Sequence, residues 1–165
     1  MLLSVKFPMR TAATTVILVT LLSGCSPEVS NDDLPAGVEQ TLQARSSAVD
    51  EYREAQEVYE LPEGQSWPEP RFTDEGGSYE SGYGESEAVL VWNCAWGREY
   101  LVRRADGPVV AAHALEQFAA LTETDAYQSF FDPVSVHPVI EGAIENARLG
   151  DPTGIQSIVT GGCPP

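Results

Sequence analysis

The sequence contains very few of the residues that carry positive charge or bind metals. Its 165 residues include one lysine, Lys6, and two histidines, against 25 aspartates and glutamates, and the formal net charge is −16. An acidic surface of this kind repels nucleic acid and anionic lipid and attracts cations or basic partners. We therefore expect no nucleic-acid partner, and we expect most acidic side chains simply to be solvated.

Motifs of the common catalytic classes are also missing. The chain has no G-x-S-x-G, H-E-x-x-H, glycine-rich phosphate loop or C-x-x-C, and its acids form no D-x-D-x-D-G calcium loop. His113 is expected to be a surface group, and His137 a capping or edge residue. Asp74 and Glu75 lack the apolar surroundings that raise a carboxyl pKa for acid catalysis. We therefore predict no enzyme activity, no cofactor and no metal site.

The first 25 residues carry the most specific signal in the chain. Lys6 and Arg10 precede an apolar run of about a dozen residues, which is shorter than the ~20 residues needed to span a bilayer. The run ends in L-S-G-C at residues 22–25, which resembles the lipobox of bacterial lipoproteins. This resemblance implies cleavage before Cys25, acyl chains such as palmitate on that cysteine, and a place on the extracytoplasmic face of the cell membrane. The alternative is an ordinary signal peptide with a chance cysteine.

The lipobox divides the chain into three parts. Residues 1–24 are the predicted signal peptide, 25–33 a polar tether, and 34–165 a single helical domain. Removing residues 1–24 takes away two bases and no acid, so the mature chain has seven arginines, no lysine and a formal charge of −18. Nothing after residue 24 is apolar enough to span a bilayer, so we expect membrane contact through the lipid anchor.

Residues 86–104, SEAVLVWNCAWGREYLVRR, form the longest strongly apolar run of the mature part. At ~100° per residue, apolar side chains cover most of the circumference of a helix here. They leave a narrow stripe of polar or small residues, which consists of Ser86, Asn93, Gly97 and Arg104. A helix that is apolar nearly all round is normally buried. A strand is the competing interpretation, since Val89 to Trp92 favours strands, but the length of the run without proline favours a helix.

The other segments predict helices packed around this one. The apolar spacing of Val38, Leu42, Val49, Tyr52 and Tyr59 predicts one helix of ~25 residues over 34–59, with a coiled coil as the alternative. Later helices are expected over 108–121, from Thr124 or Asp125 to 131, from Pro133 or Pro138 to 149, and over 151–160. Their expected inner residues are Val110, Ala111, Ala114, Leu115, Phe118, Leu121, Val139, Ile140, Ala143, Ile144, Ala147, Ile155, Ile158 and Val159. The fold class is therefore all-α, a small bundle of five or six helices.

Cys94 and Cys163 are the two cysteines that remain after processing. Outside the cell they are free to form a disulfide, which would pin the carboxyl-terminal segment onto the central helix. Closing a loop of this length contributes ~4 kcal/mol in the chain-entropy model. Metal binding by two thiols without a nearby histidine is the alternative.

Residues 61–84 form a long loop rich in proline, glycine and tyrosine. Three prolines and five glycines exclude a long helix here. Trp67, Phe72, Tyr79 and Tyr83 suit a loop wrapped over the helices, or a binding loop, since Tyr, Ser and Gly recur in recognition loops. Tyr79 and Tyr83 are therefore weak candidates for ligand binding. Asn93 is a third, although a polar residue in so apolar a helix usually has a structural hydrogen-bond partner.

G-Y-G at residues 82–84, W-x-C-A-W-x-x-E-Y-L at 92–101 and a cysteine near the end together resemble small actinobacterial cell-surface lipoproteins. The resemblance covers most of residues 60–163, and it implies an extracytoplasmic, disulfide-bonded helical domain without implying an activity. We expect a lipid-anchored, non-catalytic binding or envelope-associated module, with an envelope protein as a candidate partner. The alternatives are a small-ligand or cation-binding carrier and a cell-wall-acting enzyme.

Overall fold

The hydrophobic core is built around helix α2, Tyr83–Arg103. The structure is a computed structural model, and it describes residues 42–72 and 77–164. Ten of the 21 residues of α2 are buried, and they lie around most of its circumference. The buried residues are Gly84, Ala88, Val89, Trp92, Asn93, Cys94, Ala95, Trp96, Gly97 and Tyr100. The prediction of a buried central helix is confirmed, although the helix begins a little earlier than expected.

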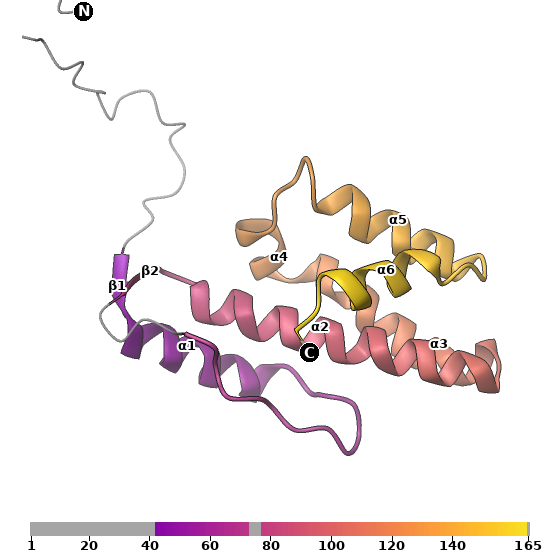
Figure 1. The fold of residues 1–165 in the computed structure, drawn as a ribbon, viewed down its shortest axis with the longest axis horizontal. Coiled ribbons are helices and arrows are strands. Elements are labelled where there is room, and N and C mark those ends of the chain that lie inside the picture. The colour runs from indigo at the N-terminus through magenta and orange to yellow at the C-terminus, as the bar shows by residue number, and fades with distance from the viewer. Residues whose placement is uncertain (1–41, 73–76, 165) are drawn as a thin grey trace, which may run out of the picture. The chain divides into compact units, whose positions relative to one another are not determined.

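Five other α-helices are present in the described part of the chain. They are α1 (Arg45–Val58), α3 (Pro108–Ala119), α4 (Asp125–Phe130), α5 (His137–Arg148) and α6 (Thr153–Gly161), with short 3-10 turns at Arg104–Asp106 and Ala120–Glu123. Figure 1 shows α1 along one side of α2, with α3 and α6 against other sides of the same helix. α2 packs against α1, α3, α4 and α6, while α5 packs against α3 and α6. The predicted small helical bundle is therefore present.

The single helix predicted over residues 34–59 is wrong in its described amino-terminal part. Leu42–Ala44 form strand β1, which pairs antiparallel with β2, Ser78–Glu80, so that Leu42 lies opposite Glu80. Leu42, expected on the inner stripe, is 67% exposed. The apolar spacing failed because it is a local signal and cannot show pairing with a distant segment. Tyr52 and Val49 are buried as predicted, and Val38 lies outside the described residues.

The helices after α2 lie close to their predicted positions, but two of the residues predicted to face inward are exposed. The side chain of Thr124 accepts a hydrogen bond from the backbone N–H of Tyr127 and caps α4. α5 begins with His137, immediately before the second of the two prolines considered, Pro138, because the carboxylate of Asp132 accepts the N–H groups of Val134 and Ser135 and holds a separate turn before it. The expected inner residues are buried or half-buried except Val110 and Val139, which are exposed. Both lie at the edge of an apolar stripe, where spacing predicts burial least well.

Asn93 and Gly97, the middle residues of the polar and small stripe, lie where neighbouring helices pack on α2, whereas Ser86 is half-buried and Arg104 is exposed. The side-chain amide of Asn93 donates a hydrogen bond to the carbonyl oxygen of Phe118 at the end of α3, over 2.8 Å. A Cβ atom on Gly97 would lie 3.0 Å from Val159 of α6 and 3.2 Å from the Phe118 ring. The middle of the stripe is therefore a packing surface of the core.

The predicted disulfide is present. Cys94, in the middle of α2, is bonded to Cys163, 69 residues later, with the two Cα atoms 5.7 Å apart. Figure 1 shows the carboxyl-terminal end returning to α2 after α6. Arg98 adds a second attachment, because its guanidinium donates a hydrogen bond to the carbonyl oxygen of Pro164.

The G-Y-G motif fixes the amino end of α2 against α1. The backbone N–H groups of Gly82 and Gly84 both donate to the carboxylate of Glu51, over 2.8 and 3.0 Å. A negative charge at this position also complements the dipole of α2. A Cβ atom on Gly84 would lie 1.8 Å from the carbonyl oxygen of Ala48, so α1 and α2 can approach this closely only with glycine there.

The described part of the chain is one compact unit without a membrane-spanning helix. Among the described helices, none combines the length and the apolar character required to cross a membrane. Cys25, the predicted tether and the predicted helix start near residue 34 lie outside the described residues. The described residues all belong to one compact unit, Val38–Pro165.

Replacing Gly84 by alanine tests the close approach of α1 and α2. Gly84→Ala should lower the free energy of unfolding by about 1–3 kcal/mol, since the new methyl group meets backbone that has to move. Gly142→Ala in α5 is the matched control, because a Cβ there meets no atom within 4 Å. It should leave stability unchanged or raise it by up to about 1 kcal/mol. Urea unfolding of both variants measures the difference, and equal stabilities would contradict the packing described.

Candidate functional site

Residues 59–72, which follow α1, have no regular secondary structure, yet side chains of α1 and α2 fix their path. The indole N–H groups of Trp92 and Trp96 both donate to the carbonyl oxygen of Glu60, over 3.1 and 3.0 Å. The hydroxyl of Tyr52 donates to the carbonyl oxygen of Pro68 over 3.0 Å. These bonds hold residues 60–68 beside the helices.

The aromatic side chains of this segment pack onto the same helices. The ring of Tyr52 meets Trp67 edge-on at a centroid distance of 5.9 Å and Phe72 at 6.2 Å. Arg45 of α1 also donates a hydrogen bond to the carbonyl oxygen of Phe72. The loop that the sequence predicted over residues 61–84 is therefore present in its first part, up to residue 72, whereas Ser78–Glu80 form β2 and residues 83–84 already belong to α2.

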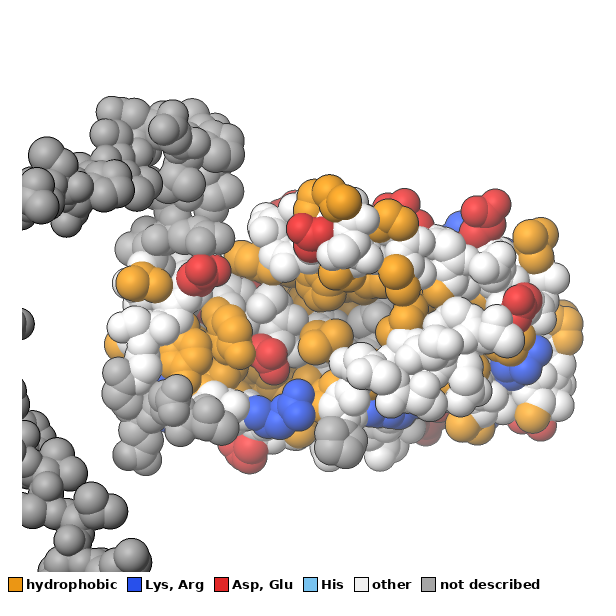
Figure 2. Space-filling model, turned by 45° about the horizontal axis from the view of Figure 1, so that its top comes forward, with side chains coloured by type: hydrophobic (Ala, Val, Ile, Leu, Met, Phe, Trp, Pro, Cys, Tyr) orange, Lys and Arg blue, Asp and Glu red, His pale blue; other side chains and the backbone are white. Residues whose placement is uncertain are grey.

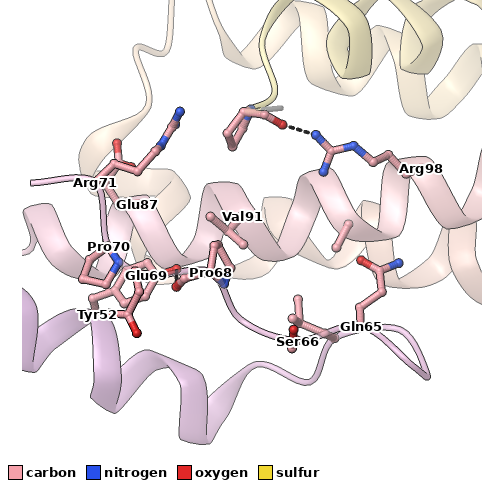
Figure 3. A pocket seen from close by; sticks show the side chains of 13 residues that line it. Tyr52, Gln65, Ser66, Pro68, Glu69, Pro70, Arg71, Glu87, Val91 and Arg98 are labelled. Atoms are coloured by element: carbon pink, nitrogen blue, oxygen red, sulfur yellow. Dashed lines mark hydrogen bonds between the residues drawn. The ribbon is translucent and has the colours of Figure 1, made fainter.

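A groove of about 220 Å³ lies between this segment and α2. One wall is formed by Glu87, Val91, Ala95 and Arg98, which project from one face of α2. The opposite wall is the exposed stretch 65–71 (Figure 3). We call this cavity the α2 groove. Its volume is below the roughly 300–1,000 Å³ of pockets that enclose a drug-sized molecule, so it suits a ligand that lies partly outside it.

Charged side chains stand at the two ends of the α2 groove. Figure 3 shows Arg71, Glu69 and Glu87 gathered at one end and Arg98 at the other, with Val91 between them. The two salt bridges of the described residues, Arg53–Asp50 and Arg103–Glu99, involve neither of the groove arginines.

Acidic side chains are scattered over the surface in view in Figure 2, and basic ones are few. Two arginines in one groove therefore stand out in a chain with 25 acids and only nine lysines and arginines. Burial, followed by the charges of Glu87 and Glu69, raises the pKa of the Tyr52 hydroxyl, which donates to the carbonyl oxygen of Pro68.

The ligand-binding candidates from the sequence lie outside the lining of the α2 groove. Tyr79 and Tyr83 form a cluster with Phe72 at the amino end of α2, with centroid distances of 5.1–5.6 Å. Tyr83 is 37% exposed, and burial of its ring raises its pKa. Asn93 is 2% exposed, and its side-chain amide donates a hydrogen bond to the carbonyl oxygen of Phe118, so the amide has a structural role in the core.

The histidines also occupy the places expected for them. His113 is exposed and meets Trp96 edge-on, and both line a second hollow of about 580 Å³ that also includes residues 60–63. His137 is the first residue of α5 and stacks on Tyr127 at a centroid distance of 3.9 Å.

In the described parts of the chain, no group of three histidine, cysteine or acidic side chains is arranged to hold a metal ion.

The sequence did not single out Arg71, Arg98, Glu69 or Glu87. The only available signal was the spacing of Glu87, Val91 and Ala95, which places them on one face of a helix.

Comparison with protein-family models, curated proteins and solved structures found no match to this chain.

The Tyr52 hydroxyl can be tested as the support of the groove wall. Tyr52→Phe keeps the aromatic packing and removes the bond to Pro68, so the free energy of unfolding should fall by about 1 kcal/mol. Residues 65–71 should also become more sensitive to limited proteolysis. Tyr79→Phe is the control, because its hydroxyl has no hydrogen-bond partner among the described residues, and it should change neither quantity. Equal behaviour of the two variants would contradict the assignment.

Proposed function

We propose that the chain is a lipid-anchored extracytoplasmic protein that binds a polypeptide of the cell envelope through the α2 groove and catalyses no reaction on it. The α2 groove is the observation on which the binding role rests. Its apolar floor, charged ends and small enclosed volume suit a partner that lies along it.

The proposed anchor is supported by the sequence at residues 22–25, L-S-G-C, after a basic start and a short apolar run. Two or more acyl chains hold a protein on a membrane far more firmly than one, because each buried CH₂ adds ~0.8 kcal/mol. The predicted attachment point is Cys25, and the tether over residues 25–33 would connect it to the helical domain.

The proposed compartment is supported by the Cys94–Cys163 disulfide. Disulfides persist in secreted and cell-surface proteins and are rare where thiols are kept reduced. The predominance of acidic residues over basic ones fits a soluble surface outside the membrane that does not bind anionic lipid or nucleic acid.

Site-specific photo-crosslinking in intact cells tests the proposal. A photoreactive amino acid replaces Ser66, an exposed residue of the groove wall, in the full-length chain with its own signal segment. The matched control carries it at Ser157, an exposed serine of α6 away from the groove lining. We expect a discrete protein adduct in the membrane fraction from position 66 and none from position 157.

The Cys25→Ala variant controls for location in the same experiment. It should leave the membrane fraction and lose the adduct from position 66. Adducts of equal yield from both positions would show that the α2 groove is not the binding surface. Retention of Cys25→Ala on the membrane would show that the anchor is elsewhere.

A further inference from the structure

The dimensions of the α2 groove match a short stretch of extended polypeptide. Glu87 and Arg98 mark its ends on α2 and are 11 residues apart, which corresponds to ~16 Å along a helix. An extended chain covers the same distance in about five residues. The opposite wall, residues 65–71, runs alongside this face of α2 in Figure 3. The two walls therefore enclose a linear path between them.

The backbone of the wall is free to pair with such a peptide. Within residues 66–71, the described part of the chain provides one hydrogen bond to the backbone, from Tyr52 to the carbonyl oxygen of Pro68. Pro68 and Pro70 have no N–H to donate, and the remaining backbone N–H and C=O groups of this stretch have no partner among the described residues. A mostly exposed backbone without partners among the described residues is a surface to which a peptide can add as a further strand.

The end of the groove at Arg98 suits a carboxylate. The guanidinium of Arg98 already donates to a peptide oxygen, the carbonyl of Pro164, and none of its other N–H groups has a hydrogen-bond partner among the described residues. Gln65 is the polar neighbour of Arg98 at this end in Figure 3. Arginine binds carboxylates through two parallel, charge-assisted hydrogen bonds. At the opposite end, Arg71 lies with Glu69 and Glu87, so the charges there are mixed.

We propose that the α2 groove recognises the free carboxyl end of a partner polypeptide, with its last five or so residues extended along residues 65–71 and its terminal carboxylate on Arg98. This inference rests on the function proposed above and adds the chemistry of the partner. The apolar middle of the groove, with Val91 and Ala95, receives side chains of the peptide. The mixed charges of Arg71, Glu69 and Glu87 lie where the peptide continues into the rest of the partner.

Affinity selection with peptide mixtures tests this proposal. The purified full-length lipoprotein, in detergent, is offered three mixtures of random pentapeptides, and retained peptides are identified by mass spectrometry. The first is acetylated at the amino end with a free carboxylate, the second is acetylated with a carboxyl-terminal amide, and the third has both ends free. We expect retention from the first and third mixtures, with the amides about tenfold or more weaker because a charge-assisted hydrogen bond is lost.

Variants assign the selectivity to one residue. Arg98→Gln should remove the preference for a free carboxylate, and Arg98→Lys should keep part of it. Arg53→Gln, an exposed arginine paired with Asp50 on α1, should behave like the unchanged protein. Thermal unfolding of each variant confirms that the fold is retained, and the Cys94–Cys163 disulfide holds the carboxyl-terminal segment in place in all of them.

Three results would overturn the inference. They are equal retention of acids and amides, a preference that survives Arg98→Gln, and retention of the unacetylated peptides alone, which would assign the groove to free short peptides. Any of these results together with a crosslinked adduct from position 66 would leave the proposed binding role standing. Failure of both experiments would remove the groove as a binding site.

Discussion

The structure depends on burying a helix that is apolar nearly all round. Buried residues such as Val89, Cys94 and Ala95 project from different sides of α2, so no single neighbour can cover them. Removing each large side chain from water contributes roughly 1.5–3 kcal/mol. The chain obtains this stabilisation by placing α1, α3, α4 and α6 around α2 and by bonding its carboxyl-terminal segment to Cys94.

Close helix packing then explains the small residues. Gly84 lies against the backbone of Ala48, Gly97 lies between Phe118 and Val159, and Ala88 and Ala95 are buried on α2. Gly154 of α6 likewise allows close packing on α5, because a Cβ atom at this position would lie 2.8 Å from the Cα and Cβ atoms of Ala143. Asn93 is the buried polar residue of α2, and its side-chain amide donates a hydrogen bond to the carbonyl oxygen of Phe118 at the end of α3.

Local signals were sufficient to predict much of the fold. The apolar run of α2, the Thr124 cap, the proline at the start of α3 and the two remaining cysteines each specify structure through nearby residues or simple chemistry. Prediction failed where distant residues decide the outcome. β1 exists because residues 42–44 pair with residues 78–80, and an apolar stripe at helical spacing cannot reveal such pairing.

The candidate site was harder to predict than the fold for the same reason. Its walls come from residues 65–71 and from α2, and Pro164 reaches it from the far end of the chain. The course of the loop is set by two indole groups that share the carbonyl of Glu60, a geometry that sequence patterns do not encode. Tyr79 and Tyr83 were predicted as binding residues because tyrosine is common in binding loops. Arg71 and Arg98 have no sequence pattern around them that would predict a binding role.

Native-state hydrogen exchange of the disulfide-bonded protein measures the central claim most directly. Amide groups in the middle of α2, around residues 92–97, should be the slowest to exchange and should exchange only through global unfolding. Exchange in α5, which packs on α3 and α6 at the outside of the bundle, should be faster. If α2 exchanged as fast as α5, or before it, the fold would not be organised around α2.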